Sequence, residues 1–325
     1  MKKLIITLFF GIIIFMFGIP LAVLNGFSEP ARSLSQASSV VRLLDKNTGA
    51  VKYLPLEEYL VGVVAAEMPA KFHLEALKAQ AVAARTYTVK RMFDYGAKPN
   101  PDHPGGEVCT DPGHCQAWID STEQRKRWGL LQYFVQVNQI TKAVELTKGQ
   151  VIAYNKVPID PVYHGSCGGK GTENSEDVWS YAIPYLRGVD CKSEYKAEQQ
   201  IVSNEFNREK IFNLVRSNQS EVLPALTNQT SLFGPAKKSP QGRLREIQIY
   251  GQVLTGTELR KILGLSSTMV TWQETGSKIR FTSVGKGHAV GLCQYGANGM
   301  ALVGRQYREI LLHYYTGVKI QKLKY

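Results

Sequence analysis

One long apolar run, ended by a single acidic residue, dominates the pattern of hydrophobic and polar positions. Every residue from Leu60 to Ala66 is apolar or glycine, Glu67 follows, and Pro69 prevents a helix from continuing. The pattern predicts a short buried helix with Glu67 at its C-terminal end. A carboxylate there meets the negative end of the helix dipole and an apolar wall, and both disfavour its ionised form. Such a carboxyl group can act as a general acid at neutral pH.

The next stretch, His73 to Phe93, is predicted to form a second helix that is dense in alanine, so that neighbouring elements can approach it closely. Arg85 lies inside it and needs an anionic or carbonyl partner, because an unpaired buried charge is costly. Two interpretations fit equally well. Arg85 and Glu67 form a structural ion pair, or Glu67 is catalytic and Arg85 helps to position a substrate.

The rest of the pattern mixes strands and helices. The pattern predicts hairpins at Val41–Leu54, Gln150–His164 and Val270–Val284, and a strand at Arg245–Gly251. It predicts helices at Trp118–Thr147, at Lys192–Leu223 and after Thr255. Loops are predicted at Gly165–Ser180 and Thr227–Arg243. The last helix, which ends at Gly317, carries apolar residues at the i, i+3, i+4, i+7 spacing: Tyr307, Ile310, Leu311 and Tyr314. We therefore predict an α+β fold, a mixed helical and β-rich domain over residues 41–325.

The N-terminus has the pattern of a membrane anchor. Leu4 to Leu24 has no charge and is long enough to span a bilayer, and Lys2 and Lys3 precede it directly. We expect residues 1–27 to form an uncleaved single-pass anchor and residues 28–40, rich in Ser, Ala and Gln, to form a linker. The positive-inside rule then places the domain that follows outside the cytoplasm. The alternative is a cleaved signal peptide, whose apolar region is normally shorter and is followed by small residues.

The composition narrows the class of partner. The 325 residues are 44% hydrophobic and 20% charged, with a net charge of +12, which is typical of a basic globular protein. A basic surface suits an anionic partner, whether nucleic acid, a membrane or an acidic cell-wall polymer. An exported protein without a nucleic-acid recognition motif is not expected to bind nucleic acid. A membrane and an acidic cell-wall polymer therefore remain as candidate partners.

An irregular loop at residues 98–118 carries a candidate metal site. It contains two histidines and two cysteines, His103, Cys109, His114 and Cys115. Two thiolates and two imidazoles make a complete tetrahedral zinc set, and a set without an open position is structural rather than catalytic. The sequence favours a structural Zn²⁺, because an irregular loop of this length needs a cross-link to hold its conformation. The alternative is a disulfide between Cys109 and Cys115 with solvated histidines. A zinc hydrolase is disfavoured, since no HExxH motif is present.

Two glycine-rich segments, 161–179 and 285–301, are candidate sugar-binding loops. Glycines let backbone amides approach a ligand, and the hydroxyl, imidazole and aromatic groups that sugars need are present in both. The candidate substrate-binding residues are Tyr163, His164, Ser166, His288, Gln294 and Tyr295, together with Arg85. Each segment taken alone is also consistent with an ordinary turn.

Three ordered motifs together resemble the stage II sporulation protein D family: VVAAEMPAKFHLEALKAQAVAARTY, YHGSCGGKGTENSEDVW followed by PYLRGVD, and GHAVGLCQYGANGMALVGRQYREILLHYYTG. The resemblance extends from about Val41 to the C-terminus. It implies that Glu67, in the V-V-A-x-E-M-P motif, is the catalytic acid, and that Arg85 is the arginine of the A-A-R-T-Y motif. Some members hold a zinc ion with two histidines and two cysteines in the loop after the second helix, which matches the four residues above.

The chain departs from the family pattern at its cysteines. In the last motif Ala289 and Cys293 replace a glycine and a serine, which puts ligand contact by residue 293 in doubt. Cys167 stands in a Y-H-S-x-S-G-G-like motif and is a candidate to pair with Cys191.

The resemblance implies a lytic transglycosylase that acts on peptidoglycan during engulfment of the forespore. It further implies a place in the mother-cell membrane facing the septal wall, beside stage II sporulation proteins P and M. Such an enzyme needs one carboxylic acid, because the substrate's own C6 hydroxyl attacks; a hydrolase needs a second carboxylate. Candidates for a second carboxylate are Glu173, Glu176 and Asp177. The alternative from another class is a non-enzymatic wall-binding protein that stimulates an amidase.

Overall fold

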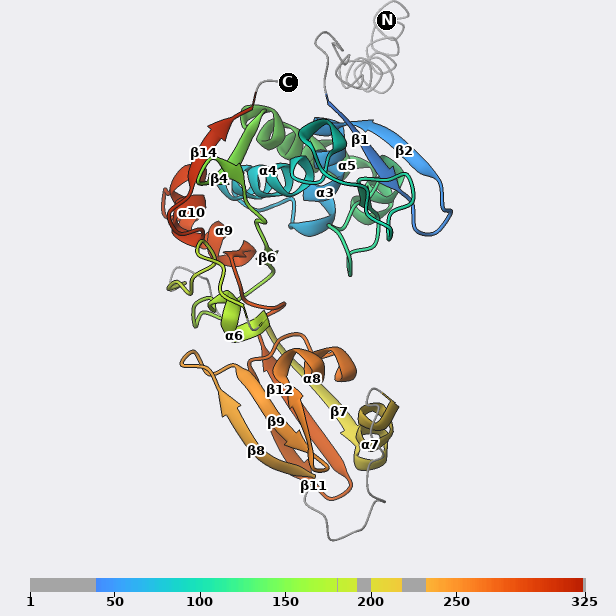
Figure 1. Ribbon diagram of the computed structural model, residues 1–325, viewed down its shortest axis with the longest axis vertical. Helices are drawn as coiled ribbons and strands as arrows, with labels where there is room; N and C mark the ends of the chain where they lie inside the picture. The colour runs from blue at the N-terminus through green and yellow to red at the C-terminus, as the bar shows by residue number, and fades with distance from the viewer. Residues whose placement is uncertain (1–38, 180, 192–199, 218–231, 324–325) are drawn as a thin grey trace, which may run out of the picture.

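The computed structural model describes residues 39–179, 181–191, 200–217 and 232–323, which form two lobes stacked along the long axis of the molecule (Figure 1). The predicted anchor and nearly all of the predicted linker lie outside these residues. Within the described ranges, no helix has the length and apolar character needed to cross a membrane. The fold is a mixture of helices and small sheets, as predicted.

Three helices and a hairpin begin the first lobe. The hairpin of β1 (Val40–Leu44) and β2 (Val51–Pro55) is antiparallel, and the short β3 (Val108–Cys109) pairs with β1 in parallel. The helices α3 (Leu56–Glu67), α4 (Leu74–Val89) and α5 (Ser121–Leu146) contact one another, and α5 is interrupted at Gly129, where φ is 71°. After α4 the chain makes a 3-10 turn, η2 (Phe93–Tyr95).

The predicted buried helix is α3, and its bounds follow from its sequence. Pro55 precedes it, and Glu57 and Glu58 in its first turn favour the positive end of the helix dipole. Its interior residues Leu60, Val63 and Val64 are fully buried. It ends at Glu67, because Met68 is extended and Pro69 follows.

The C-terminal part of the chain returns to complete the first lobe. There β4 (Gln150–Tyr154) lies between β14 (Lys319–Lys322) and β5 (Val157–Pro158), all antiparallel. The helices α9 (Gln294–Leu302) and α10 (Tyr307–Tyr314) pack on α4. Helix α4 is therefore enclosed from several sides, which its alanines permit: Ala76, Ala79, Ala81, Ala83 and Ala84 all have no exposed surface.

The second lobe is an insertion, of which the structure describes residues 201–217 and 232–284. One sheet has the order β11 (Val270–Thr275), β12 (Lys278–Val284), β7 (Ile201–Asn207), and the other has the order β10 (Gln252–Thr255), β9 (Leu244–Ile249), β8 (Phe233–Lys238). Helices α7 (Arg208–Ser217) and α8 (Gly256–Leu263) complete it, and α8 begins with the predicted capping box of Thr255 and Glu258. The lobe has its own apolar core, which includes Ile247, Leu259 and Phe281.

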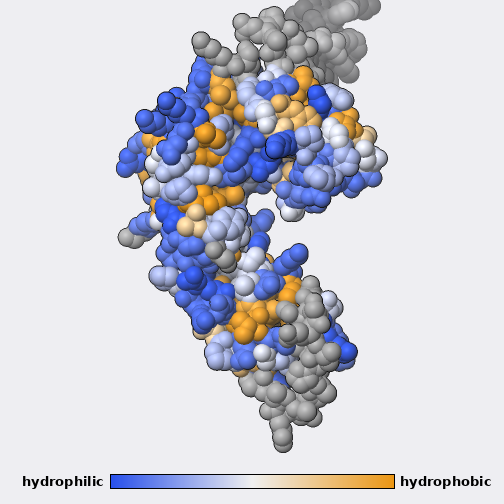
Figure 2. Space-filling view, viewed as in Figure 1, coloured by the Kyte–Doolittle hydropathy of each residue, from blue (hydrophilic) through white to orange (hydrophobic). Residues whose placement is uncertain are grey.

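The two lobes meet at a short parallel pair of strands, β6 (Tyr163–His164) and β13 (Leu292–Cys293), and at helix α6 (Ser175–Trp179). A buried ion pair crosses the junction: Arg243 Nη1 lies 3.1 Å from Glu173 Oε1. The space-filling view shows a hollow in the molecular surface between the two lobes (Figure 2).

Several predicted elements need correction. Of the helix predicted at Lys192–Leu223, the described part is strand β7 followed by the shorter helix α7. Strand β7 forms because it pairs along its whole length with β12, a long-range contact that composition does not reveal. The predicted loop at Thr227–Arg243 contains the edge strand β8. The hairpin predicted at Gln150–His164 turns at Asn155–Lys156 as expected, but it stops at Pro158, and residues 163–164 pair with β13 instead.

Candidate functional site

Glu67 is the last residue of α3, which lies in the first lobe (Figure 1). Its side chain is half-buried, and the backbone N–H of Ala117 donates a hydrogen bond of 2.7 Å to Oε1. No basic residue lies in the last turn of α3, so the carboxyl group meets the negative end of the helix without compensation from its own helix.

Burial raises the pKa of Glu67 above the ordinary value of 4.5. Hydrogen bonds from the Ala117 N–H and the Tyr163 hydroxyl, and the positive charge of Lys286, each lower this pKa, but burial is the larger effect. Glu67 therefore keeps its proton to a higher pH than an exposed glutamate does. This is the property expected of a general acid.

The segment after the irregular loop is held against α3 by a tryptophan. A Cβ on Gly62 would come within 2.2 Å of Trp118 Nε1, so glycine at this position lets the indole lie directly on the helix. The Ile119 N–H also points at the Gly62 carbonyl, 3.4 Å away. These contacts hold residues 117–119 beside α3 and explain why the amide of Ala117 reaches Glu67.

Strand β6 brings Tyr163 to the same place from a distant part of the chain. Its hydroxyl donates to Gln116 Oε1 at 3.0 Å, and Gln116 Nε2 in turn donates to Thr88 Oγ1 at 3.2 Å. Beyond β6, Ser166 and Lys286 exchange two backbone hydrogen bonds of 3.0 and 2.8 Å. This bridge places the exposed Lys286 close enough to Glu67 to lower its pKa.

Arg85 is not part of this site, which corrects both roles predicted for it, the ion pair with Glu67 and the positioning of a substrate. It has no exposed surface, and it pairs with Glu57 rather than Glu67: Nη2 lies 2.6 Å from Oε2 and Nε lies 3.1 Å from Oε1. Its remaining donors point at the carbonyl oxygens of Val144 and Gln150, at 3.0 and 3.3 Å. Arg85 ties α3, α4, α5 and β4 together, and its burial leaves no surface for a substrate.

Most of the other predicted substrate-binding side chains are buried as well. His164, Ser166 and Gln294 have exposed fractions of 4%, 1% and 5%. Ser166 Oγ accepts a hydrogen bond from the Gly168 N–H, and Gln294 Nε2 donates to Gln80 Oε1. Tyr295 stays half-buried, with its ring 4.9 Å from that of Phe72.

His288 supports the backbone with both ring nitrogens. Its Nδ1 accepts from the Val290 N–H at 3.1 Å, so Nε2 carries the proton and donates to the Tyr163 carbonyl at 3.0 Å. Burial, reinforced by neighbouring His164, lowers the pKa of His288 to about 3, and the ring is neutral at physiological pH. The structure thus places His288 behind Tyr163, where it orients β6.

The candidate second carboxylates all form ion pairs. Glu173 pairs with Arg243 as described above, Glu176 lies 2.5 Å from Arg187 Nη2, and Asp177 lies 2.9 Å from Arg245 Nη2. The hydrogen bond from Arg187 lowers the pKa of Glu176 to about 2. A carboxylate that is committed to an arginine is a poor base for activating water.

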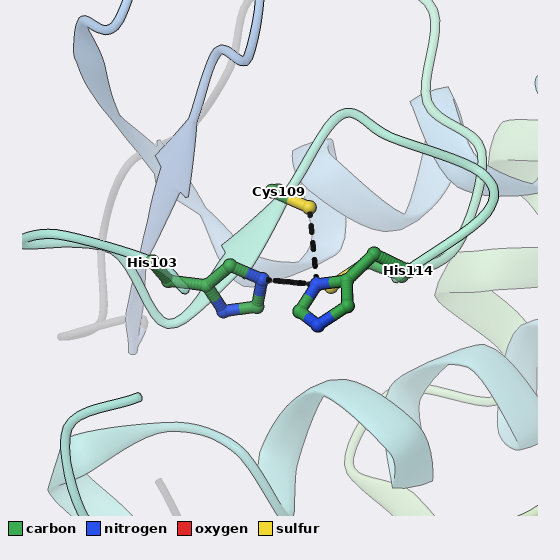
Figure 3. A group of neighbouring side chains, drawn as sticks. His103, Cys109 and His114 are labelled. Atoms are coloured by element: carbon green, nitrogen blue, oxygen red, sulfur yellow. Dashed lines mark hydrogen bonds between the residues drawn. The ribbon is translucent and has the colours of Figure 1, made fainter. Parts of the chain in front are cut away.

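The predicted metal ligands come together in space, and Figure 3 shows three of them, His103, Cys109 and His114. The ligand atoms of His103, Cys109, His114 and Cys115 all lie within 4.8 Å of one another. His103 Nε2 is 2.8 Å from His114 Nδ1 and 3.4 Å from Cys115 Sγ, and Cys109 Sγ is 3.7 Å from His114 Nδ1. Ligand atoms around a tetrahedral zinc ion lie about 3.3–3.8 Å apart, so the four side chains fit such an ion with small adjustments.

Two further features of this loop fit a metal site. Burial lowers the pKa of His103, which favours the neutral imidazole that a metal requires. In the structure Cys109 and Cys115 form no disulfide, and neither do Cys167 and Cys191.

Two contributors to the site were missed from the sequence. The Ala117 amide belongs to the backbone and leaves no signal in the side-chain pattern. Lys286 does stand between two glycines in the second glycine-rich segment, and a charged residue in such a setting is a recognisable signal.

Comparisons with known proteins match this chain along most of its length. The SpoIID family model, described as stage II sporulation protein, matches residues 44–154, which include Glu67 and the four predicted zinc ligands. The chain is 36% identical over 300 residues to stage II sporulation protein D of Bacillus subtilis (strain 168), covering 91% of this chain and 82% of that protein. It is 34% identical over 296 residues to stage II sporulation protein D of Bacillus amyloliquefaciens, with the same coverage.

A relative with a different name is also similar. The chain is 29% identical over 308 residues to the amidase enhancer of Bacillus subtilis (strain 168). This match covers 80% of the chain but only 40% of the enhancer.

Proposed function

The chain belongs to the stage II sporulation protein D family, and from this premise we propose that it is a lytic transglycosylase that cleaves peptidoglycan glycan strands during forespore engulfment. The bond cleaved joins MurNAc to GlcNAc, and the product carries a 1,6-anhydromuramoyl end. The observation that carries the proposal is the state of Glu67, a half-buried carboxyl group at the C-terminal end of α3 whose pKa is raised by burial.

In this mechanism Glu67 serves twice. It first protonates the glycosidic oxygen, and the resulting carboxylate then accepts the proton of the muramoyl C6 hydroxyl as that oxygen closes on C1. Ala117 and Tyr163 keep the carboxyl group in place through their hydrogen bonds. Ion pairing of Glu173, Glu176 and Asp177 supports a route without a second carboxylate.

Product analysis tests this proposal directly. Purified glycan strands are incubated with the full chain or with Glu67→Gln, and the products are identified by mass spectrometry. We expect anhydromuramoyl ends with the wild type and almost none with the variant. Reducing ends in place of anhydro ends would identify a hydrolase and contradict the proposal.

The amidase-enhancer relative supports a second candidate function, a non-enzymatic wall-binding protein that stimulates a partner amidase. This function predicts that the wild-type chain binds glycan strands but releases no product. It also predicts that Glu67→Gln stimulates a purified amidase as well as the wild type does. The two candidates therefore give opposite results in the same pair of experiments.

We further propose that His103, Cys109, His114 and Cys115 hold one structural Zn²⁺. With four protein ligands the ion would fasten the loop that supplies the Ala117 amide, and it would offer no open position for substrate. Elemental analysis of chain purified without chelator should give zinc, and Cys109→Ser with Cys115→Ser should lose one equivalent. Retention of the same zinc content by this double variant would contradict the assignment.

The proposed location is the outer face of the mother-cell membrane, with residues 1–27 as anchor and the septal wall as substrate. Stage II sporulation proteins P and M are the proposed protein partners, on the basis of the family resemblance. Protease added to protoplasts should remove the folded part of the chain. Release of a shortened chain into the medium would show instead that the N-terminal segment is cleaved.

A further inference from the structure

A second cluster of metal-binding side chains lies apart from the loop at residues 98–118. The sulfur atoms of Cys167, Cys191 and Cys293 all lie within 4.8 Å of one another. Their exposed fractions are 0%, 2% and 0%, so the cluster is closed to solvent. The three residues come from separate segments: the loop after β6, the segment after α6, and the end of β13.

Hydrogen-bond donors surround these sulfur atoms. Cys293 Sγ accepts from the backbone N–H groups of Cys167 and Gly296, both at 3.3 Å, and it caps the N-terminus of the nine-residue helix α9. Cys191 Sγ lies 3.0 Å from the hydroxyl of Tyr314. The Cys293 thiol also donates to the Gly165 carbonyl oxygen at 3.8 Å. The two backbone N–H groups are the kind of outer contact that metal-bound thiolates receive in proteins.

Gly296 provides the space that the cysteine cluster needs beside α9. A Cβ on Gly296 would come within 2.3 Å of Cys191 Sγ and 2.1 Å of the Tyr314 hydroxyl. Glycine is therefore required here for the sulfur and the hydroxyl to reach the end of α9.

An unsatisfied imidazole nitrogen lies beside the cluster. The His164 ring interacts with the Cys167 side chain, and its Nε2 is buried without a hydrogen-bond partner among the described residues. Its Nδ1 lies 3.2 Å from the Val290 carbonyl oxygen, and a proton on Nδ1 leaves Nε2 as a bare electron pair. A metal-binding histidine normally shows this pattern, with the second nitrogen donating to a carbonyl.

We propose that Cys167, Cys191 and Cys293 bind a second metal ion, a thiophilic cation such as Zn²⁺, next to the ring of His164. Without a cation the three buried side chains are neutral thiols, and a metal ion would displace their protons on binding. A disulfide would use two of the sulfurs and leave the third, with its donors, unexplained. A soft cation uses all three.

The ion would join three segments directly beyond Tyr163 and His164 in strand β6. It would hold the second glycine-rich segment to the first through Cys293 and Cys167. Its role is therefore to fix the position of β6 relative to Glu67, and it is separate from the chemistry that Glu67 performs.

Metal content tests the proposal without any measurement of activity. The full chain is purified anaerobically without chelator or reductant, and its metals are counted by elemental analysis. We expect about two equivalents per chain for the wild type. Cys191→Ser and the matched double variant with Cys109→Ser and Cys115→Ser should each keep about one, and the triple variant should have none.

Cobalt spectroscopy gives a second measurement that does not depend on the folding of Cys191→Ser. The double variant of Cys109 and Cys115 retains only the second cluster, so Co²⁺ added to it should produce thiolate-to-metal charge-transfer bands, which His164→Ala should alter. One equivalent in the wild type that disappears completely in the double variant would overturn the proposal. A disulfide between two of the three cysteines in the anaerobic preparation would overturn it as well.

Discussion

The two ends of α3 hold glutamates in opposite surroundings, although both belong to one helix of 12 residues. Glu57 lies in the first turn, at the positive end of the helix dipole, and both of its carboxylate oxygens accept hydrogen bonds from the buried Arg85. Glu67 lies at the negative end, where an apolar wall raises its pKa and its nearest donor is a neutral amide.

The comparison teaches that the position along a helix, together with the partner, decides what a glutamate does. At the first end the charge is neutralised by an arginine and stabilises the fold. At the second end the charge is disfavoured, and the proton that remains is available for chemistry. Each of the following experiments changes one end and asks whether the other end is affected.

The largest effect is expected from removal of Arg85. Arg85→Met keeps the apolar stem but leaves Glu57 without its partner, and breaking a buried ion pair in this way costs about 3–5 kcal/mol. The free energy of unfolding, measured with urea, should fall by this amount. Glu57→Gln should have an effect of similar size, and the double variant should lose less than the sum of the two.

The catalytic rate of the molecules that remain folded should not change with Arg85→Met, because Arg85 has no exposed surface. An Arg85→Met variant with wild-type stability but a strongly reduced rate would contradict the purely structural role of Arg85. It would return Arg85 to the substrate-binding residues.

The next largest effect is expected at the other end. Glu67→Gln keeps the size of the side chain and an acceptor for the Ala117 N–H, but it cannot donate and recover a proton. The rate on glycan strands should fall by about 100-fold or more, equivalent to about 2.7 kcal/mol in the barrier. Stability at neutral pH should not fall.

The pH dependence of stability sharpens this prediction. Because the pKa of Glu67 is raised in the folded state, the folded chain holds this proton to a higher pH than the unfolded chain does. Its contribution to stability is complete below about 4.3 and is lost as the pH rises through the raised value. Glu67→Gln removes this loss, so the stability of the variant relative to the wild type should increase with pH. A constant difference across the range would show that the pKa is not raised.

The surroundings of the two glutamates at the ends of α3 could be predicted from the sequence with unequal success. Glu67 could be placed, since an apolar run and a proline fix the end of a helix by local rules. The partner of Arg85 could not, because the sequence identifies a buried arginine but not which of several acidic residues faces it. Glu57, 28 positions away along the chain, became the partner through the packing of α3 on α4.

Long-range pairing limited the fold prediction in the same way. The capping box at Thr255 and the hairpin at residues 270–284 depend on nearby residues and are confirmed. Strand β6 could not be predicted as a partner of β13, because two residues carry no recognisable period and the partner is more than 120 positions away. The insertion at residues 201–284 was missed for this reason as well.

A smaller effect is expected from the hydroxyl of Tyr163. Tyr163→Phe removes the hydroxyl that donates to Gln116 and lowers the pKa of Glu67, but it keeps the ring. We expect the rate to fall about tenfold, or about 1.4 kcal/mol, because the carboxyl group is held less firmly. The pKa of Glu67 should rise, since the lost hydroxyl lowers it in the wild type. An unchanged rate and pH profile would show that β6 does not support Glu67.

The smallest effect is expected from Lys286, which acts on Glu67 through charge alone. Lys286→Met should raise the pKa of Glu67 and move the basic limb of the pH–rate profile upward, by less than about one unit because an exposed charge is screened. The shift should shrink as salt is added. Lys148→Met, which removes an exposed lysine just after α5, is the matched control and should leave the profile unchanged. If Lys286→Met instead raised KM for anionic glycan strands and left the pH profile in place, Lys286 would bind the substrate directly. The pKa of Glu67 would then be set by burial, which raises it, and by Ala117 and Tyr163, which lower it.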